Sequence, residues 1–374
     1  MTIGVRWSTL QSSRWHSFPV PPDPAAYRAD VQRAHAEGKQ FVPYTNFNMQ
    51  SDTGDAWAYW GEEWNGYAGQ GKAADVLAMN LVNVRCCAMT PSWCDFITWK
   101  YKTFLDEYDS DGFYLDNSVP VPCRNPRHPA SHHHRRHIFA ARALMKRIYT
   151  INKRNDPANL MVCHMSTCLC IPVLSFCDAI VDGEQYGWAL HEDFDGHYMP
   201  LTPLARVRAE LMAWQWGPVP FFLPCNRGPN PWTPKLMREL LALMLPHGMR
   251  FWHSGHRQTM AKVLDVVDAF GLDEARFIPY WSVADWRRMA DDDGLVLSAY
   301  ARGERAMLLV ANLRAQPRDV GLTLDARTLG LAALPRGAAD PLDGLPAAWA
   351  DGKLQLRIEG RDLRIVLLGQ DGTP

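Results

Sequence analysis

The sequence predicts an α/β fold, a (β/α)8 TIM barrel followed by a small antiparallel β-sandwich. Short apolar segments alternate with helical patterns from the first residues onward, which is typical of consecutive βα units and a parallel sheet. Eight such segments occur before residue 276, and about 250 residues is the usual size of a closed barrel of this kind. After Phe270-Gly271 the pattern changes to short alternating strands. We therefore expect a barrel over residues 1–276 and a sandwich over residues 277–374.

The predicted barrel strands are short apolar runs bounded by turn residues. In chain order they are Val5–Leu10, Phe41–Phe47, Leu81–Met89, Gly112–Asp116, Leu160–Met165, Ala179–Glu184, Val219–Pro224 and Met249–His253. The fourth strand has one apolar face and one face that ends in Asp116. Because the inward face of a barrel opens at the carboxyl end of its strands, Asp116 is expected at the mouth, where active sites of this fold lie. An Asp that caps the following loop is the plainer alternative.

Capping residues mark several of the intervening helices. Thr233-Pro234 opens a helix whose apolar stripe ends before Gly248, and Thr202-Pro203 opens a similar one. Tyr27, Val31 and Ala34 indicate an earlier helix closed by Gly38. Two units are irregular: residues 48–80 form a long insertion rich in Trp and Gly, and Pro172 leaves room only for a short crossover.

The C-terminal region contains five candidate strands with alternating patterns. They are Leu295–Ala301, Ala306–Asn312, Val320–Leu324, Leu354–Ile358 and Leu363–Leu368. The turns at residues 302–304 and 359–362 are typical of hairpins, and Ala332–Ala348 is expected to be a long surface loop.

Composition excludes several classes of partner. A net charge of −1 and a pI near 6.9 create no field of one sign, so we expect neither nucleic acid nor an anionic membrane surface as partner. Apolar runs such as Leu240 to Pro246 are far shorter than the roughly 20 residues of a bilayer span. The N-terminus lacks the pattern of a signal peptide, which indicates a cytoplasmic protein, or a periplasmic or secreted one if a leader was removed.

Cysteine usage favours reduced thiols and no metal or cofactor. The nine cysteines are an odd number and do not form the spaced pairs of a disulfide scaffold. The run Cys163 to Cys170 contains His164 but lacks the two-residue spacing of structural zinc sites.

Acidic residues reach the predicted rim from only two strands. The fourth strand ends in Asp116, and the sixth brings Asp182 and Glu184. Two carboxylates across a small gap are what cleavage of a glycosidic bond requires. Strands four and six are separated by one neighbour, so the gap fits either the retaining or the inverting geometry. We expect Asp116 as nucleophile and Glu184 as acid/base, with Asp182 one layer deeper orienting sugar hydroxyls. The alternative for the strand-six pair is a structural carboxylate that holds an Arg or a backbone amide.

Aromatic and polar residues at the other strand ends favour a carbohydrate ligand, because sugar rings stack on indoles while their hydroxyls seek polar side chains. The chain has fifteen Trp residues. The candidate substrate-binding residues are Trp7, Tyr44, Asn46, Trp93, Asn117, His164, Trp188, Asn226, Arg227 and His253.

The basic segment His132 to His137 is expected to begin the helix after the fourth strand. A solvated basic turn is the favoured interpretation, with recognition of an anionic substituent through Arg135 and Arg136 as the functional one. A histidine metal site is the third, in which His133 and His137 would converge on one helix face.

Three pieces resemble (β/α)8 glycoside hydrolases of the family 123-like and α-galactosidase-like kinds: Ala36 to Tyr44, Asp111 to Asn117, and Asp182-Gly-Glu184-Gln. The resemblance implies an Asp nucleophile after strand four, here Asp116, and an acid/base after strand six, here Glu184 or Asp182. Those families commonly carry a Lys where this chain has Tyr114. The terminal β-sandwich is also similar to the domain that accompanies many such barrels.

These observations predict a retaining, exo-acting glycosidase that acts on a poly- or oligosaccharide. Two alternatives remain open: a catalytically silent carbohydrate-binding barrel, and a metal-dependent hydrolase built on the His cluster.

Overall fold

The computed structural model divides the chain into two compact units, and each is described by itself. One unit comprises residues 1–181 with 216–219, and the other comprises residues 182–215 with 220–374. The structure describes residues 3–6, 21, 23–52, 56–66, 75–77, 81–133, 136–166, 168–189, 198–225, 232–252 and 254–369. The predicted boundary at residue 276 stays a prediction.

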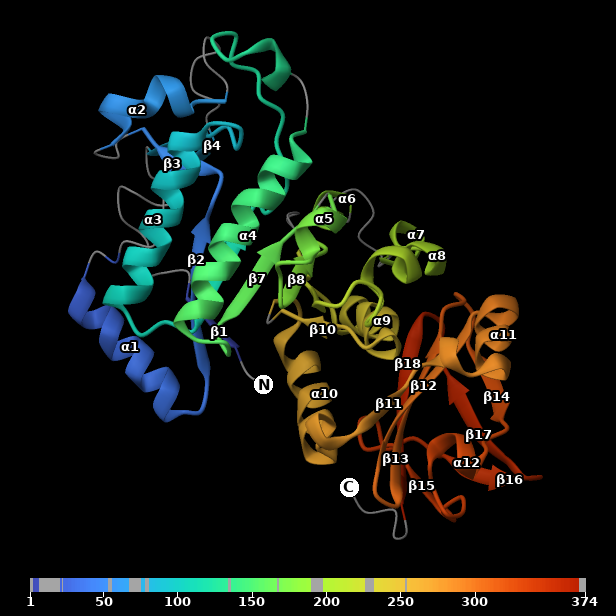
Figure 1. The fold of residues 1–374 in the computed structure, drawn as a ribbon. Coiled ribbons are helices and arrows are strands. Elements are labelled where there is room, and N and C mark those ends of the chain that lie inside the picture. Colours follow the sequence, from blue (N-terminus) through green and yellow to red (C-terminus); the bar gives the residue numbers. More distant parts are fainter. Residues whose placement is uncertain are drawn as a thin grey trace. The chain divides into compact units, whose positions relative to one another are not determined.

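The first unit is built on five parallel strands in the order β1 (Ile3–Arg6), β2 (Gln40–Asn46), β6 (Gly112–Asp116), β7 (Leu160–His164) and β8 (Ala179–Asp182). Its main helices are α1 (Pro24–Ala36), α3 (Pro91–Glu107), α4 (Ile138–Asn155) and the short α5 (Ile171–Leu174). Figure 1 shows α1, α3 and α4 running along these strands. The short α5 confirms the brief crossover predicted at Pro172.

Strand β6, which ends in Asp116, is buried along its length. Its apolar residues Phe113 and Leu115 are fully buried, as is Tyr114 between them. Gly112 begins the strand with φ +116, and a Cβ at this position would overlap the carbonyl oxygen of Leu160 on β7. Only glycine fits this close approach, which holds the start of β6 against β7.

The third predicted barrel strand was wrong. Within Leu81–Met89 only β5 (Leu81–Arg85) is a strand, and it pairs antiparallel with β3 (Met49–Ser51) and β4 (Asp75–Leu77). In the parallel sheet β2 lies directly beside β6. The apolar residues Leu81, Val82 and Val84 suit either kind of sheet, and the antiparallel partners β3 and β4 decide which one β5 joins. The insertion therefore contributes to a small sheet of its own, and α2 (Trp57–Trp64) lies between β3 and β4 along the chain.

The second unit opens with further parallel strands and helices. It contains the parallel pair β9 (Val219–Phe222) and β10 (Arg250–Phe251), with α6 (Tyr186–Ala189), α7 (Tyr198–Leu201), α8 (Leu204–Arg206), a π turn at Val207–Leu211, α9 (Pro234–Met244) and α10 (Arg257–Phe270). Helix α9 confirms its prediction: Thr233 Oγ1 accepts a hydrogen bond from the Leu236 amide at 3.1 Å, and Gly248 closes the following 3₁₀ turn with φ +69.

Two antiparallel sheets form the C-terminal part, as predicted. One has the order β11 (Arg276–Ile278), β12 (Leu295–Arg302), β13 (Arg305–Asn312), β18 (Asp362–Gly369) and β15 (Gly337–Ala339), and the other β14 (Arg318–Leu322), β17 (Lys353–Ile358) and β16 (Ala348–Ala350). Helices α11 (Ala284–Asp293) and α12 (Ala326–Leu329) complete this part. The turn at 302–304 joins a true hairpin.

Two expectations for this part were wrong. The turn at 359–362 is no hairpin, because β17 and β18 belong to different sheets. Both edges of β18 are already occupied, by β13 and β15, so the turn carries the chain from one sheet to the other. The segment Ala332–Ala348 is not a loop throughout, since it contains β15 and reaches the first residue of β16.

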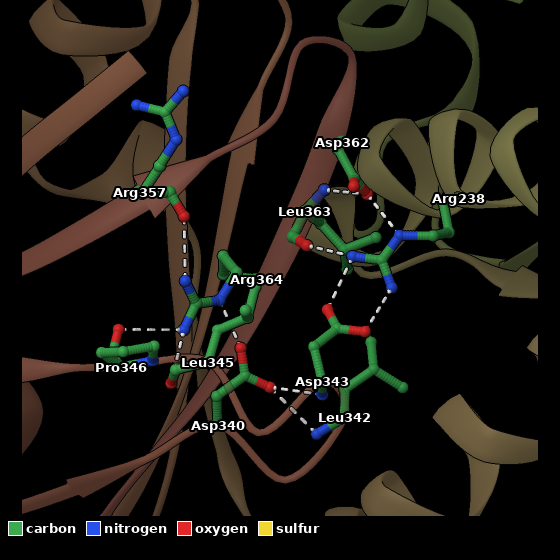
Figure 2. A network of polar contacts seen from close by, with 10 residues as sticks. All are labelled: Arg238, Asp340, Leu342, Asp343, Leu345, Pro346, Arg357, Asp362, Leu363 and Arg364. Carbon is green, nitrogen blue, oxygen red and sulfur yellow. Dashed lines mark hydrogen bonds and ion pairs between the residues drawn. The ribbon is translucent and has the colours of Figure 1, made fainter. Parts of the chain in front are cut away.

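Charged side chains attach α9 to the C-terminal sheets within this unit (Figure 2). Arg238 of α9 donates two hydrogen bonds to Asp343, at 3.0 and 2.8 Å, and one to Asp362 at 2.7 Å. Arg364 of β18 is almost fully buried and pairs with the buried Asp340, and its remaining donors bond backbone carbonyls, including that of Arg357 at 2.8 Å. Buried charges need such complete pairing, so this network fixes the register of the 340–346 segment.

No helix among the described residues combines the length and apolar character needed to cross a bilayer.

Candidate active site

Asp116 is the last residue of β6 and is 18% exposed. On one side it lies in register with Asn46 at the end of β2, and on the other side β7 ends in His164. The carboxyl ends of these three parallel strands therefore meet where the predicted nucleophile stands. Strand β7 is the single neighbour between β6 and β8, as expected for the fourth and sixth predicted strands.

Both carboxylate oxygens of Asp116 accept hydrogen bonds. Oδ1 lies 3.0 Å from Nδ1 of His164 and 2.7 Å from the backbone amide of Asn117. Oδ2 accepts from the hydroxyl of Tyr44 and, at 2.9 Å, from the side-chain amide of Asn117. Four donors directed at one partly buried carboxylate hold it in one orientation.

The same donors keep Asp116 ionised. Burial by itself raises the pKa of this carboxyl, but the hydrogen bond and charge of His164, the Tyr44 hydroxyl and the Asn117 amide outweigh it, and the pKa is lowered. Burial and the nearby Asp116 charge raise the pKa of both Tyr44 and Tyr114, so both phenols remain protonated. At neutral pH the site therefore presents a carboxylate among neutral hydroxyls.

His164 is held by partners on both ring nitrogens. Nδ1 also lies 2.8 Å from the Tyr114 hydroxyl, and Nε2 lies 2.6 Å from Oγ of Ser166. A proton on Nδ1 lets the ring donate toward Asp116, and Nε2 shares a hydrogen bond with the Ser166 hydroxyl. Tyr114 was not among the predicted site residues, although it shares the strand face of Asp116, and that shared face was the signal that could have identified it.

The turn after Asp116 is shaped by Asn117, whose φ is +51. Its carbonyl accepts from the side chain of Asn48 at 2.8 Å, and the next amide, of Ser118, donates to the carbonyl of His164 at 2.9 Å. Asn tolerates this left-handed backbone better than most residues. The turn therefore links the ends of β6 and β7 and directs the Asn117 amide back to the carboxylate.

Asp182 and Glu184 lie in the second unit. Asp182 ends β8, is 3% exposed, and its Oδ1 accepts from the amide of Gly183 at 2.7 Å. The predicted strand extended to Glu184, but it ends at Asp182, because Gly183 adopts φ +111 against the ring of Phe222. Glu184 lies in the following turn and is partly buried. The alternation of strand faces that predicted an inward Glu184 thus ends at Asp182. The pairing of Glu184 with Asp116 stays a prediction.

The remaining candidate residues have different surroundings. Asn46 is fully buried, accepts from the amide of Asn48 at 3.1 Å and donates to the sulfur of Met49. Trp93 was expected at a strand end but lies inside α3, fully buried, with its ring 5.4 Å from that of Trp64. Trp188 belongs to α6. The predicted binding residues Trp7, Asn226, Arg227 and His253 lie outside the described residues.

The basic segment does not begin a helix, which corrects that expectation. Residues Ala130–His132 form a 3₁₀ turn, and α4 begins only at Ile138, with His137 as its N-cap. His133 and His137 therefore do not share a helix face. The structure instead brings His132 close to His128 and Cys87, a combination that sequence spacing did not indicate.

A hollow of about 420 Å³ in the second unit is lined by residues around Arg238, Leu345 and Arg357, and no predicted site residue belongs to its lining. The hollow therefore does not include Asp116, whose partly buried, hydrogen-bonded carboxylate is the group suited to catalysis.

Comparison with solved structures identifies the fold. An α-amylase from Geobacillus thermoleovorans, complexed with acarbose, matches with a TM-score of 0.59 at 10% identity, over 95% of this chain and 83% of that one. A debranching enzyme from Nostoc punctiforme matches with a TM-score of 0.58 at 13% identity, over 99% and 86% of the two chains. A maltogenic α-amylase from Thermotoga neapolitana matches with a TM-score of 0.57 at 11% identity, over 92% and 80%.

The predicted fold class, a TIM barrel followed by an antiparallel β domain, is thereby confirmed. No protein-family model matches the sequence, and no curated protein matches it.

Proposed function

We propose that this protein is a glycoside hydrolase that cleaves a glycosidic bond in a poly- or oligosaccharide, with Asp116 as nucleophile. The observation that carries the proposal is the ionised, four-fold hydrogen-bonded carboxylate at the carboxyl end of β6. The fold adds support, because the similar solved structures include α-amylases and a debranching enzyme. A shared fold does not establish an activity, so the proposal depends on the charge and position of Asp116.

The proposed reaction is retaining and exo-acting. An Asp116 oxygen attacks the anomeric carbon while Glu184 protonates the departing glycosidic oxygen, which leaves a glycosyl ester on Asp116. Glu184 then takes a proton from water, and the resulting attack on the anomeric carbon releases the sugar and restores both carboxyl groups. Asp182 orients sugar hydroxyls. The hydroxyl of Tyr44 and the ring of His164 keep Asp116 charged and directed until attack.

The substrate is proposed only as a class. The resemblance of three segments to α-galactosidase-like and family 123-like barrels brings galacto-configured sugars and N-acetylhexosamines into the set. One similar structure holds acarbose and another, AmyP, holds maltose, which brings in α-glucans. Arg136, in the segment between β6 and α4, is cationic and could bind an acidic substituent, so anionic sugars also belong to the candidate substrates.

A screen of aryl glycosides tests the proposal. It should include both anomers of galactosides, glucosides, fucosides, arabinosides and N-acetylhexosaminides, and maltooligosaccharides and uronate-containing oligosaccharides should be assayed alongside. We expect hydrolysis of one series with retention of configuration, read by NMR. The matched control is Asp111→Asn, a carboxylate at the opposite end of the same strand that bonds the Phe41 amide at 2.6 Å. This control should keep its turnover, whereas Asp116→Asn should not.

Two other outcomes would replace the proposal. Binding of a sugar by calorimetry without hydrolysis of any substrate would indicate a silent carbohydrate-binding barrel. Hydrolysis that a chelator abolishes and added metal restores, and that survives Asp116→Asn, would indicate a metal-dependent hydrolase.

Chemical rescue separates the two acids of the β8 segment. With an activated aryl substrate, Glu184→Ala should form the glycosyl ester but stall at its hydrolysis, and azide should restore turnover with a glycosyl azide as product. Rescue of Asp182→Ala, with none for Glu184→Ala, would exchange the roles of the two residues.

A further inference from the structure

Two thiols and two imidazoles that the candidate active site does not use converge in the first unit. Cys87 follows β5, while Cys123, His128 and His132 belong to the segment between β6 and α4. The ligand-type atoms of Cys87, His128 and His132 all lie within 4.8 Å of one another. Sγ of Cys123 lies 3.2 Å from Nδ1 of His128, and its thiol also contacts the thiol of Cys87. All nine cysteines are free thiols.

We propose that Cys87, Cys123, His128 and His132 form a structural zinc site. Two sulfur and two imidazole ligands are a common set for structural Zn²⁺ in proteins, and this soft, tetrahedral combination disfavours Mg²⁺ and Ca²⁺. Ionisation of both thiols on binding releases two protons and leaves a site with no net charge. Such a site suits the buried position of both cysteines.

Two sulfur–nitrogen separations fit a tetrahedral zinc ion. Zn–S bonds of about 2.3 Å and Zn–N bonds of about 2.0 Å at tetrahedral angles put a sulfur and a nitrogen ligand about 3.6 Å apart. Sγ of Cys123 lies 3.2 Å from Nδ1 of His128, and Sγ of Cys87 lies 3.8 Å from Nδ1 of His132. Both pairs lie within about 0.4 Å of that separation. Cys123 is not among the three residues whose ligand atoms all lie within 4.8 Å of one another, so its side chain must move closer to the others to complete the tetrahedron.

The ring of His128 is already oriented as a ligand. Its Nε2 lies 2.8 Å from the carbonyl oxygen of Glu63, so Nε2 carries the proton and the lone pair of Nδ1 faces the thiols. A ligating histidine usually has a carbonyl or carboxylate partner of this kind on its other nitrogen, which fixes tautomer and ring plane. This contact distinguishes the cluster from a chance meeting of core cysteines.

The ligands would join segments that backbone hydrogen bonds already bring together. The amide of Cys87 donates to the carbonyl of Trp64 at 2.9 Å, and the amide of Arg124 donates to that of Gly66. The side chain of Asn125 donates to the carbonyl of Asn65 at 2.7 Å. A metal here would cross-link the residues after β5 to the segment between β6 and α4, which begins directly after Asp116.

Metal analysis of the whole protein tests this site without any activity assay. Protein purified with zinc and dialysed extensively should hold one Zn²⁺ per chain by mass spectrometry. Replacement by Co²⁺ should give a thiolate-to-metal band in the near ultraviolet and strong visible bands typical of tetrahedral coordination. Calorimetric titration in buffers of different ionisation heats should report release of about two protons per metal at a pH below the thiol pKa.

The variants should localise the ion. Cys123→Ser and His128→Asn are expected to lower retained zinc at least tenfold, whereas Cys168→Ser, which removes a thiol outside the cluster, should retain it fully. A chelator should lower the melting temperature of the parent and of Cys168→Ser.

Wild-type protein that retains no zinc and gives no Co²⁺ thiolate band would overturn the proposal, whatever the variants do. A Cys87–Cys123 disulfide found by peptide mapping of freshly purified protein would also overturn it. Since the readout is the metal, failure here leaves the proposed glycosidase function untouched, and failure of the glycoside screen leaves the zinc site untouched.

Discussion

Replacing Asp116 by Asn changes the charge of the candidate site and nearly preserves its shape. The amide oxygen should occupy the position of Oδ1, because the backbone amide of Asn117 at 2.7 Å can only donate. The new NH₂ group then faces the hydroxyl of Tyr44, which can rotate to accept, and the side chain of Asn117, whose amide can turn to present its oxygen. All four hydrogen bonds can therefore be kept in neutral form.

The expected change in stability is small. A hydrogen bond to a charged group contributes about 1.5–3 kcal/mol and a neutral one about 0.5–1.5 kcal/mol, so four bonds lose roughly 4–6 kcal/mol of favourable interaction. Removing a charge from a site that is 18% exposed relieves a desolvation cost of several kcal/mol in the opposite direction. The net change in the free energy of unfolding should stay within about 2 kcal/mol, a melting shift below about 8 °C.

The expected change in turnover is large. Loss of a nucleophilic or charge-bearing member of a catalytic set typically lowers kcat by on the order of 10⁴-fold, about 5.5 kcal/mol of activation free energy. The assay combines thermal unfolding with initial rates on the best aryl glycoside from the screen. A folded variant with a rate within tenfold of the parent would refute the role of Asp116. A variant that fails to fold would instead favour a structural Asp that caps its loop.

Three further predictions follow from charged groups. Asp116 must be ionised to act, so activity is present above its lowered pKa and lost as pH falls through it. His164→Gln should raise that pKa and move the acid limb of the kcat/KM profile to higher pH. An acid limb that does not move would show that another group sets it. Burial raises the pKa of Glu239 on α9 from 4.5 to about 7, so its contribution to stability is complete below pH 4.5 and lost as pH rises through 7, on the order of 3 kcal/mol. Urea unfolding at pH 5 and pH 8 should show this loss in the parent and not in Glu239→Gln; equal pH dependence in both would refute it. Arg364→Met leaves the buried Asp340 without its cation and should lower the free energy of unfolding by about 3–5 kcal/mol. Arg357→Met, at a side chain that is 61% exposed, should lower it by less than about 0.5 kcal/mol. Similar losses in the two variants, measured by chemical unfolding, would contradict this account.

Local signals predicted much of the fold. Strand β6 was predicted with its observed bounds because glycine, a fully apolar centre and a terminal carboxylate delimit it. Helix α9 was predicted from its Thr233-Pro234 start. Strand β5 was misplaced because its apolar residues fit either sheet, and the partner strands that decide the matter come from an insertion without a regular pattern. The turn at 359–362 was misread for a similar reason: turn chemistry does not tell whether the next strand stays in the same sheet.

The candidate site was predicted in part. Asp116, Tyr44, Asn117 and His164 were identified from strand ends alone, and the structure brings these four together. Trp93 was misplaced together with β5, since its strand-end position depended on that strand. The thiol and imidazole cluster was missed because Cys87 and Cys123 are far apart in sequence, and a search for closely spaced pairs cannot detect ligands joined only by tertiary structure.

The close approach at Gly112 also provides a way to find relatives of this chain. A side chain there would overlap the Leu160 carbonyl, so mutation can hardly replace the glycine without separating β6 from β7. The carboxylate that ends the same strand stands four residues later. In a lineage whose overall sequence has drifted beyond recognition, a glycine and an aspartate at this spacing, with a second strand ending in histidine, should be among the last features to disappear.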